Sequence, residues 1–252
     1  MYFEIGCILL ISFVSANTAS NLKIMGGEPA DIKDHPYIVS LYYFGYFWCD
    51  GSILDEYTIL TAAHCVIDLE PPYYFILYGN TNVNLGNKIQ VSRMIYHEKF
   101  IYQPPWTYDI AIIKLTEPIS FGETAQPVKL PKPHESTPVN KIASLAGWGI
   151  NDIDSFIYPE NLHAVNLTIF SDEECVESYQ NVDGGGLNPE TELCAGVPEG
   201  GKGQCHSDSG GPLVIDGVQY GIVSYAKGCA EKGYPGVLTK VSGYVDWIQK
   251  HR

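Results

Sequence analysis

Hydrophobic residues in this chain gather in short runs that are separated by glycine, proline and asparagine. Runs such as "YIVSLYYF" (37–44) and "DIAIIKL" (109–115) are rich in the β-branched and aromatic residues that favour strands. Many short strands punctuated by turn residues are typical of an all-β barrel or sandwich. The other predicted strands lie within 52–63, 73–79, 88–97, 142–149, 163–170, 211–226 and 236–242.

Only the C-terminal stretch, 242–252, carries a helical pattern. Tyr244, Trp247 and Ile248 recur at a spacing that places them on one side of a helix. Residues 117–138 contain five prolines and no periodic pattern, so this segment is predicted to link two β halves. The expected division is an N-terminal half at about 24–130 and a C-terminal half at about 131–252.

The N-terminus has the composition of a secretory signal. An apolar run from Ile5 to Val14 ends in small residues, and cleavage is expected after Ala16 or Ala19, which assigns 1–16 to the signal peptide. A membrane anchor is less favoured because the run is too short to span a bilayer. We therefore expect a secreted, extracellular protein. Its net charge of −14 disfavours nucleic acid and anionic membranes as partners.

The cysteines indicate disulfides in an oxidising compartment. Of seven cysteines, Cys7 lies in the predicted signal peptide, which leaves six. Six cysteines allow about fifteen pairings, and their spacing alone does not choose among them. Zinc is a weaker alternative, because no Cys-x-x-Cys pair or paired histidines accompany them. The six are Cys49, Cys65, Cys175, Cys194, Cys205 and Cys229.

The stretch "CHSDSGGPL" (205–213) places Ser209 in a tight turn. A serine hydroxyl is a weak nucleophile unless a base, itself oriented by a third group, removes its proton. His64 is the best candidate base, since it ends an apolar strand beside Cys65. His206 is offset from Ser209 by three residues. The remaining histidines stand in polar or terminal surroundings and are expected to be exposed: His35, His97, His134, His163 and His251.

An orienting carboxylate should be buried, and Asp109 is the best candidate because it opens an apolar strand. "LTAAHC" (60–65), "YDIAIIKL" (108–115) and "SDSGGP" (207–212), in that order, resemble the chymotrypsin-like, trypsin-fold serine endopeptidases. The resemblance runs from 24 to the C-terminus and extends to "IMGG", "AGWG", "CAG", "GIVSY" and "GYPGVLTKVSGYVDWI". "SILDEYTILTAAHCV" (52–66) is similar to arthropod digestive enzymes and to the mite group 3 allergens.

The resemblance implies two six-stranded antiparallel β-barrels packed together, with a C-terminal helix. His64 and Asp109 would come from the first barrel and Ser209 from the second. Ser209 would attack the peptide carbonyl, and the backbone N–H groups of Ser207 and Ser209 would bind the oxyanion. The family also implies the disulfides Cys49–Cys65, Cys175–Cys194 and Cys205–Cys229.

"NLKIMGG" (21–27) resembles a zymogen junction with a propeptide at 17–23. Cleavage after Lys23 would free the ammonium of Ile24 to pair with a buried Asp208. Because Lys23 does not suit an uncharged specificity pocket, another protease of trypsin-like specificity is expected to make this cut.

The specificity pocket implied by the family carries no acid at its base, which is Gly203. Its walls are small residues, so the expected cleavage is after large apolar residues such as Phe, Tyr and Leu. Ala226 stands where a glycine is usual, and its methyl group is expected to narrow the slot. The pocket residues are Gly203, Ser224, Tyr225, Ala226 and Gly236.

Three further residues depart from the family pattern. Ser207 replaces the usual oxyanion glycine, Asp50 replaces a glycine close to the expected cleft, and Tyr225 replaces a common tryptophan. A left-handed backbone at Ser207 would cost about 1–2 kcal/mol. An alternative is therefore a catalytically impaired protease-fold protein that binds partners. A general secreted β-barrel binding module would leave the triad and the junction unexplained.

No cofactor or metal is expected. The segment 79–95, where some relatives bind calcium, contains no Asp or Glu. "NLT" (166–168) is an acceptor sequence for a glycan on Asn166. The expected partners are protein or peptide substrates, the activating protease and protein inhibitors, and the expected state is a monomer.

Overall fold

The structure is a computed structural model that describes residues 25–103, 106–150, 158–182 and 186–252. The predicted signal peptide and propeptide, with Lys23 and Ile24, lie outside the described residues. No helix in the described part of the chain has the length and apolarity needed to cross a bilayer.

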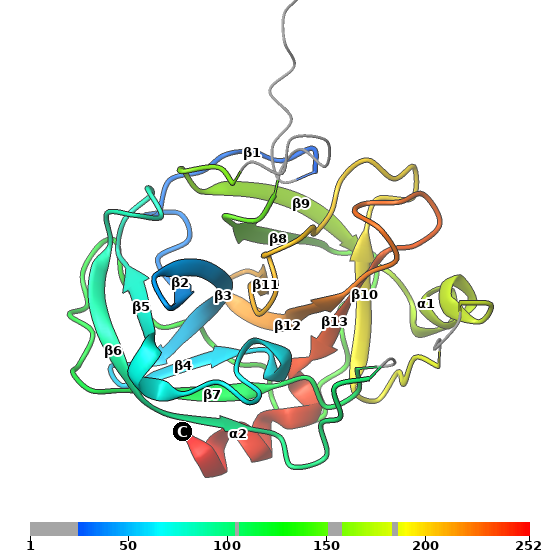
Figure 1. The fold of residues 1–252 in the computed structure, drawn as a ribbon. Coiled ribbons are helices and arrows are strands. Elements are labelled where there is room, and N and C mark those ends of the chain that lie inside the picture. Colours follow the sequence, from blue (N-terminus) through cyan, green and yellow to red (C-terminus); the bar gives the residue numbers. More distant parts are fainter. Residues whose placement is uncertain (1–24, 104–105, 151–157, 183–185) are drawn as a thin grey trace, which may run out of the picture.

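Six strands of the N-terminal half close into an antiparallel barrel in the order β2-β3-β4-β7-β6-β5 (Figure 1). Every residue of "TILT" (58–61) in one central strand is buried, which suits its β-branched side chains. The barrel strands are β2 (Ile38–Tyr43), β3 (Tyr46–Asp55), β4 (Thr58–Thr61), β5 (Tyr74–Tyr78), β6 (Asn87–Tyr96) and β7 (Ala111–Leu115).

A second barrel forms from the C-terminal half in the order β8-β9-β10-β13-β12-β11, closed by the β11–β8 pairing. The short strand β1 (Glu28–Pro29) adds to its β9, so the chain meets the second barrel before it enters the first. The strands are β8 (Ile142–Gly147), β9 (His163–Ile169), β10 (Glu192–Gly196), β11 (Pro212–Ile215), β12 (Val218–Tyr225) and β13 (Gly236–Lys240).

All nine runs that were expected to form strands do so, and the architecture is the two-barrel fold that the resemblance implies. The pattern missed β1, β10 and the first half of β3, whose first three residues lie largely toward solvent. Residues 117–138 contain no helix or strand beyond isolated bridges and connect the two barrels.

In the described ranges, two α-helices lie outside the barrels. The expected C-terminal helix is α2 (Val245–His251), preceded by a 3₁₀ turn, Val241–Tyr244. The helix α1 (Asp172–Tyr179) was not predicted, although Ser171 and Glu174 form a capping box at its start. Such a box is a helix signal readable from the sequence. Other 3₁₀ turns are Ala63–Cys65 and Pro71–Tyr73.

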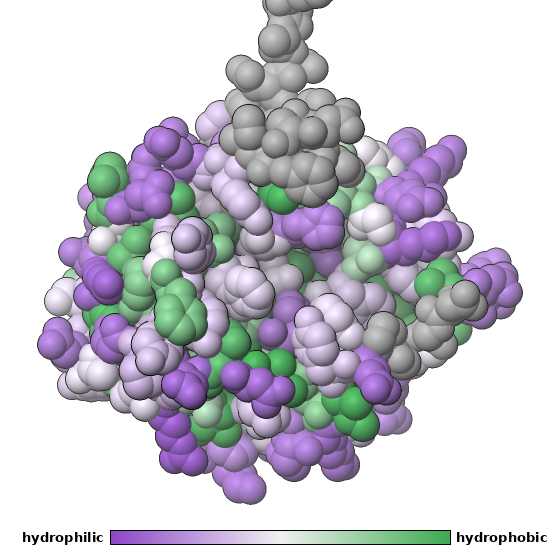
Figure 2. Space-filling model, in the orientation of Figure 1, coloured by the Kyte–Doolittle hydropathy of each residue, from purple (hydrophilic) through white to green (hydrophobic). Residues whose placement is uncertain are grey.

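The two barrels are joined by hydrogen bonds as well as by apolar packing. Ser52 Oγ donates to Gln219 Oε1 at 2.6 Å, and both residues are buried. The backbone N–H of Asp50 donates to the carbonyl oxygen of Ser209 at 2.8 Å. Segments from both halves therefore meet where Ser209 lies. On the outside, hydrophilic side chains are spread widely over the face in Figure 2, and apolar ones form separate groups.

Candidate functional site

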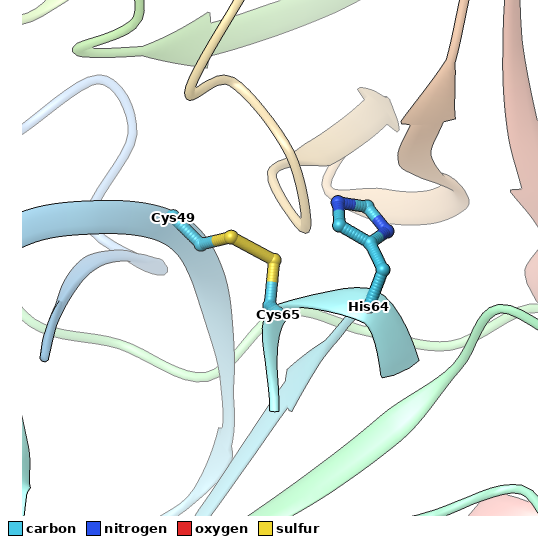
Figure 3. Close-up of side chains that lie close together, drawn as sticks. All are labelled: Cys49, His64 and Cys65. Atoms are coloured by element: carbon cyan, nitrogen blue, oxygen red, sulfur yellow. A yellow bond between two sulfur atoms is a disulfide. The ribbon is translucent and has the colours of Figure 1, made fainter. Parts of the chain in front are cut away.

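His64 is held at the seam by a 3₁₀ turn and a disulfide. The turn spans Ala63–Cys65, and Cys65 is bonded to Cys49 on β3. The His64 imidazole lies beside this disulfide, with a ring nitrogen within 4.8 Å of both sulfurs (Figure 3). The bridge therefore anchors the backbone directly after His64, and the His64 side chain lines the cleft.

Asp109 orients that ring from just before β7. This fully buried carboxylate holds His64 twice: Nδ1 lies 2.7 Å from Oδ2, and the His64 backbone N–H donates to Oδ1 at 2.9 Å. Because an ionised carboxylate only accepts, Nδ1 carries the proton. The other ring nitrogen, Nε2, is then the basic one.

Two hydroxyl groups of the second barrel hold Asp109 in turn. Ser224 Oγ donates to Asp109 Oδ2 at 2.5 Å, and Thr239 Oγ1 donates to the Asp109 carbonyl oxygen at 2.7 Å. Hydrogen bonds to an ionised group are stronger than neutral ones. The first barrel supplies this acid, and the second barrel positions it.

Ser209 and His64 line the same cleft, which has a volume of about 910 Å³. Among the described residues, no hydrogen bond joins Ser209 Oγ to the His64 ring. Catalytic contacts of this kind often tighten only when substrate is bound. The structure therefore brings the imidazole, the acid and the alcohol to one cleft, with the first two already paired.

The turn that carries Ser209 is tight. Gly210 has a φ of +78°, and a side chain there would collide with Thr61 Oγ1 and the Asp50 carbonyl oxygen. Ser207 has a φ of +69°, so the oxyanion position adopts the left-handed conformation that was expected to cost energy for a serine. Within the described part of the chain, the N–H groups of Ser207 and Ser209 have no hydrogen-bond acceptor.

Asp208 lies behind this turn and is fully buried. It accepts hydrogen bonds from the backbone N–H groups of Gly149 at 3.0 Å and Cys205 at 2.8 Å. Burial raises the pKa of Asp208 to about 7 despite these two bonds. Among the described residues no cation pairs with it.

Asp50 lies close to the cleft, where its backbone N–H donates to the Ser209 carbonyl oxygen, but Asp50 does not line the cleft. Its carboxylate is fully buried beside Asp208, and a Cβ on Gly147 would lie 2.6 Å from an oxygen of each acid. Trp148 N–H is 3.4 Å from Asp50 Oδ2, while Oδ1 has no partner among the described residues. Burial, and then the charge of Asp208, raises the pKa of Asp50 well above its usual range.

The expected specificity pocket is divided. Ser224, Tyr225 and Ala226 line the cleft, whereas Gly203 and Gly236 line a second, much smaller cavity. Gln204, which the motifs did not single out, stands between the two cavities and lines both. The only sequence signal for it is its place directly after the expected pocket base.

The expectation that five histidines are exposed is wrong for three of them. His35, His97 and His163 are each less than one-tenth exposed. His97 has charged sequence neighbours, but the rings of Tyr108 and Trp247 pack against its imidazole. The polarity of neighbouring residues does not predict that a side chain distant in the sequence, such as Trp247, buries His97.

The six cysteines form the three disulfides that the resemblance implies: Cys49–Cys65, Cys175–Cys194 and Cys205–Cys229. Two histidines, His64 and His206, lie close to disulfide sulfurs in clusters whose composition could suit a metal. Oxidised cysteines offer no thiolate, so these clusters lack the ligands that zinc sites use.

Comparisons with known proteins agree with this geometry. A family model described as Trypsin matches residues 24–248. The chain is 38% identical over 236 residues to Trypsin II-P29 of Gallus gallus, covering 92% of this chain and 90% of that protein. It is 35% identical over 247 residues to the snake venom serine protease KN3 of Trimeresurus stejnegeri, covering 96% and 91%.

A vitellin-degrading protease of Bombyx mori is 34% identical over 232 residues, covering 92% of this chain and 86% of that protein. The solved structure of neuropsin, a serine protease expressed in the limbic system of mouse brain, superposes with a TM-score of 0.80 at 28% identity, covering 90% of this chain and 98% of that one. The likeness to arthropod digestive enzymes in particular stays a prediction. With its two barrels and its family match over residues 24–248, the chain belongs to the trypsin family of serine proteases.

Proposed function

We propose that this chain is a secreted serine endopeptidase, made as a zymogen, in which Ser209, His64 and Asp109 form the catalytic triad. The observation that carries the proposal is the buried Asp109 carboxylate paired with His64 at 2.7 Å, in the cleft that Ser209 also lines. The family match supports hydrolysis of peptide bonds.

Acylation begins when Ser209 Oγ bonds to the carbonyl carbon of the peptide. Its proton passes to His64 Nε2, and Asp109 stabilises the imidazolium through the Nδ1–H bond. The carbonyl oxygen becomes an anion that accepts hydrogen bonds from the N–H groups of Ser207 and Ser209. As the C–N bond breaks, His64 returns the proton to the leaving amine, which departs.

Deacylation repeats these steps with water as the nucleophile. His64 takes a proton from the water, whose oxygen bonds to the ester carbon, and then protonates Ser209 Oγ as the acyl group leaves. The two oxyanion donors act where negative charge develops, and loss of one such donor lowers catalysis by about 10²–10³-fold. The orientation of the Ser207 backbone N–H therefore matters for this step.

Activation follows from cleavage after Lys23, which frees the ammonium of Ile24. Asp208 is the buried carboxylate that receives it. An uncompensated buried charge is costly, so the new ammonium stabilises the turn that carries Ser207 and Ser209. The raised pKa of Asp208 supports this role, because the carboxylate lacks a cation until one arrives.

Specificity is for uncharged residues before the scissile bond. The cleft wall formed by Gln204, Ser224, Tyr225 and Ala226 carries no charged side chain. Phe, Tyr and Leu are the residues that the sequence favours. Since Lys23 does not suit this wall, a separate trypsin-like protease makes the activating cut, and the pure zymogen is expected to stay unconverted on storage.

The proposal is tested by cleaving the recombinant chain with trypsin, confirming an Ile24 terminus, and titrating it with a fluorophosphonate. One label per chain, lost in Ser209→Ala, together with turnover of Leu or Phe peptides, is the expected result. A correct terminus without labelling would overturn the proposal in favour of a partner-binding protein with an impaired site. Preference for Arg peptides would overturn the pocket assignment.

Secretion, a monomeric state and recognition by protein inhibitors complete the proposal. Asn166 lies exposed on β9, so its acceptor sequence is accessible to a glycan. The exposed rim of the cleft, which includes Tyr46 and Trp48, offers aromatic surface for substrates or inhibitors.

A further inference from the structure

Gln204 occupies the boundary between two cavities. The cleft of about 910 Å³ holds His64 and Ser209, whereas the cavity behind it, about 10 Å³, is lined by Gly203 and Gly236. Gln204 and Ala226 are the residues that line both. The substrate-facing space therefore ends at these two side chains and does not reach Gly203.

The Gln204 side chain is fixed rather than loosely placed. It is buried, and its Nε2 donates to the carbonyl oxygen of Tyr225 at 2.8 Å, with that of Val237 at 3.5 Å. It also lies against Gly236, where a Cβ would be 2.6 Å from the Gln204 amide carbon and oxygen. The side chain thus spans from its own loop to strands β12 and β13.

The orientation of the amide follows from these partners. If the nitrogen and oxygen were exchanged, the Gln204 oxygen would face the Tyr225 carbonyl oxygen, and two acceptors would meet. In the present orientation Oε1 lies beside Gly236 and has no hydrogen-bond partner among the described residues. The amide group therefore separates the two cavities, and the hydrogen bond from its Nε2 holds it to β12.

We propose that Gln204 is the specificity-determining floor of the substrate pocket, and that it selects aliphatic side chains up to the size of leucine over aromatic rings. The inference rests on the proposed endopeptidase function and narrows its preference for large apolar residues. A ring needs the depth that Gln204 occupies. A single excess methylene in a closed pocket changes specificity by about 10–200-fold.

The test compares peptides that differ only in the residue before the scissile bond, namely Val, Leu, Phe and Tyr, with trypsin-activated enzyme. We expect the wild type to favour Leu over Phe by about 10-fold or more in kcat/KM. Gln204→Ser should join the two cavities and raise the Phe-to-Leu ratio by a similar factor. Gln90→Ser is the matched control: its Nε2 also donates to backbone carbonyls, far from the cleft, and the ratio should not move.

The possible outcomes distinguish a failure of the role proposed for Gln204 from a failure of the proposed endopeptidase function. Full fluorophosphonate labelling with Phe preferred by the wild type, or with an unchanged ratio in Gln204→Ser, would overturn the role of Gln204 and leave the endopeptidase standing. No labelling of the wild type would overturn both. Because the wild-type ratio needs no variant, the inference stays testable even if Gln204→Ser does not fold.

Discussion

Some residues at this site adopt strained backbone conformations that place functional groups in the cleft. Ser207 is the clearest example, because a residue with a side chain holds a left-handed backbone at the proposed oxyanion position. Its Oγ is 3.4 Å from Tyr158 Oη, a weak and exposed contact. The hydroxyl therefore offers little to offset the strain.

Ser207→Gly should accordingly stabilise the protein by about 1 kcal/mol, since glycine adopts positive φ without a Cβ clash. Urea unfolding measures the change. Ser120→Gly is the control, because Ser120 is an exposed loop serine outside the positive-φ positions, and it should not stabilise. Equal or higher kcat in Ser207→Gly would agree with an unchanged oxyanion hole, whereas a large fall would give the hydroxyl a role of its own.

Ser224 acts through Asp109 and is a positioning residue. Ser224→Ala removes a hydrogen bond to a buried carboxylate, and such bonds contribute about 1.5–3 kcal/mol. We expect kcat to fall by about 10-fold or more, with KM little changed. Ser92→Ala, which removes a hydroxyl bonded to carbonyl oxygens on the rim of the first barrel, is the control and should keep full kcat. A larger change in KM than in kcat would instead make Ser224 a substrate contact.

At the scale of elements, most strands were predictable because they bury one or both faces. The run 58–61 and the strand β7 are buried almost throughout, and their apolar residues predict this burial. β10 escaped because "ELCAG" is short and begins with a glutamate, which is buried in the structure. Its carboxylate accepts hydrogen bonds from the nearby Asn188 N–H and from Tyr225 Oη, and the second partner is too distant along the chain to leave a local signal.

The site was predictable to the extent that motifs fix turns. His64 and Asp109 were singled out because each ends or opens an apolar run, and Ser209 because its sequence neighbours indicate a tight turn. Gln204 was not found, since nothing in its neighbours tells that its amide crosses to β12. The same holds for Asp50, whose distance from Asp208 along the chain hides a shared burial site.

The paired acids predict how the uncleaved chain responds to pH. Burial raises the pKa of both, so the folded chain holds protons that the unfolded chain releases. Its stability should therefore fall as the pH rises from about 4 through about 7. Asp50→Asn removes one ionisable group and should raise the free energy of unfolding at pH 8 but not at pH 4, as followed by urea unfolding of the uncleaved protein.

Glu117→Gln is the control for that measurement, because Glu117 is exposed in the link between the barrels. It removes the same charge without touching the buried pair, and its unfolding free energy should match the wild type at both pH values. A gain at pH 8 that Glu117→Gln shares would reflect net charge and would contradict the repulsion assigned to Asp50 and Asp208.

For the whole molecule, the seam between the barrels contributes to stability through buried polar groups. Ser52→Ala would leave Gln219 Oε1 buried without its donor, at a cost of about 1–3 kcal/mol. Urea unfolding should show this loss. Ser178→Ala, which removes an exposed hydroxyl bonded within α1, is the control and should change stability far less. An equal loss of unfolding free energy in both variants would contradict a special contribution of the seam to stability.

The bonds that cross the seam also decide how the two halves can move. The Asp50 N–H holds the carbonyl of Ser209, while Ser224 and Thr239 hold Asp109 from the opposite side. Any motion that separated the two barrels would move Ser209 and Asp109 out of alignment together. Neither barrel expressed alone should therefore have catalytic activity. Mild denaturant should abolish the activity of the whole chain before either barrel unfolds.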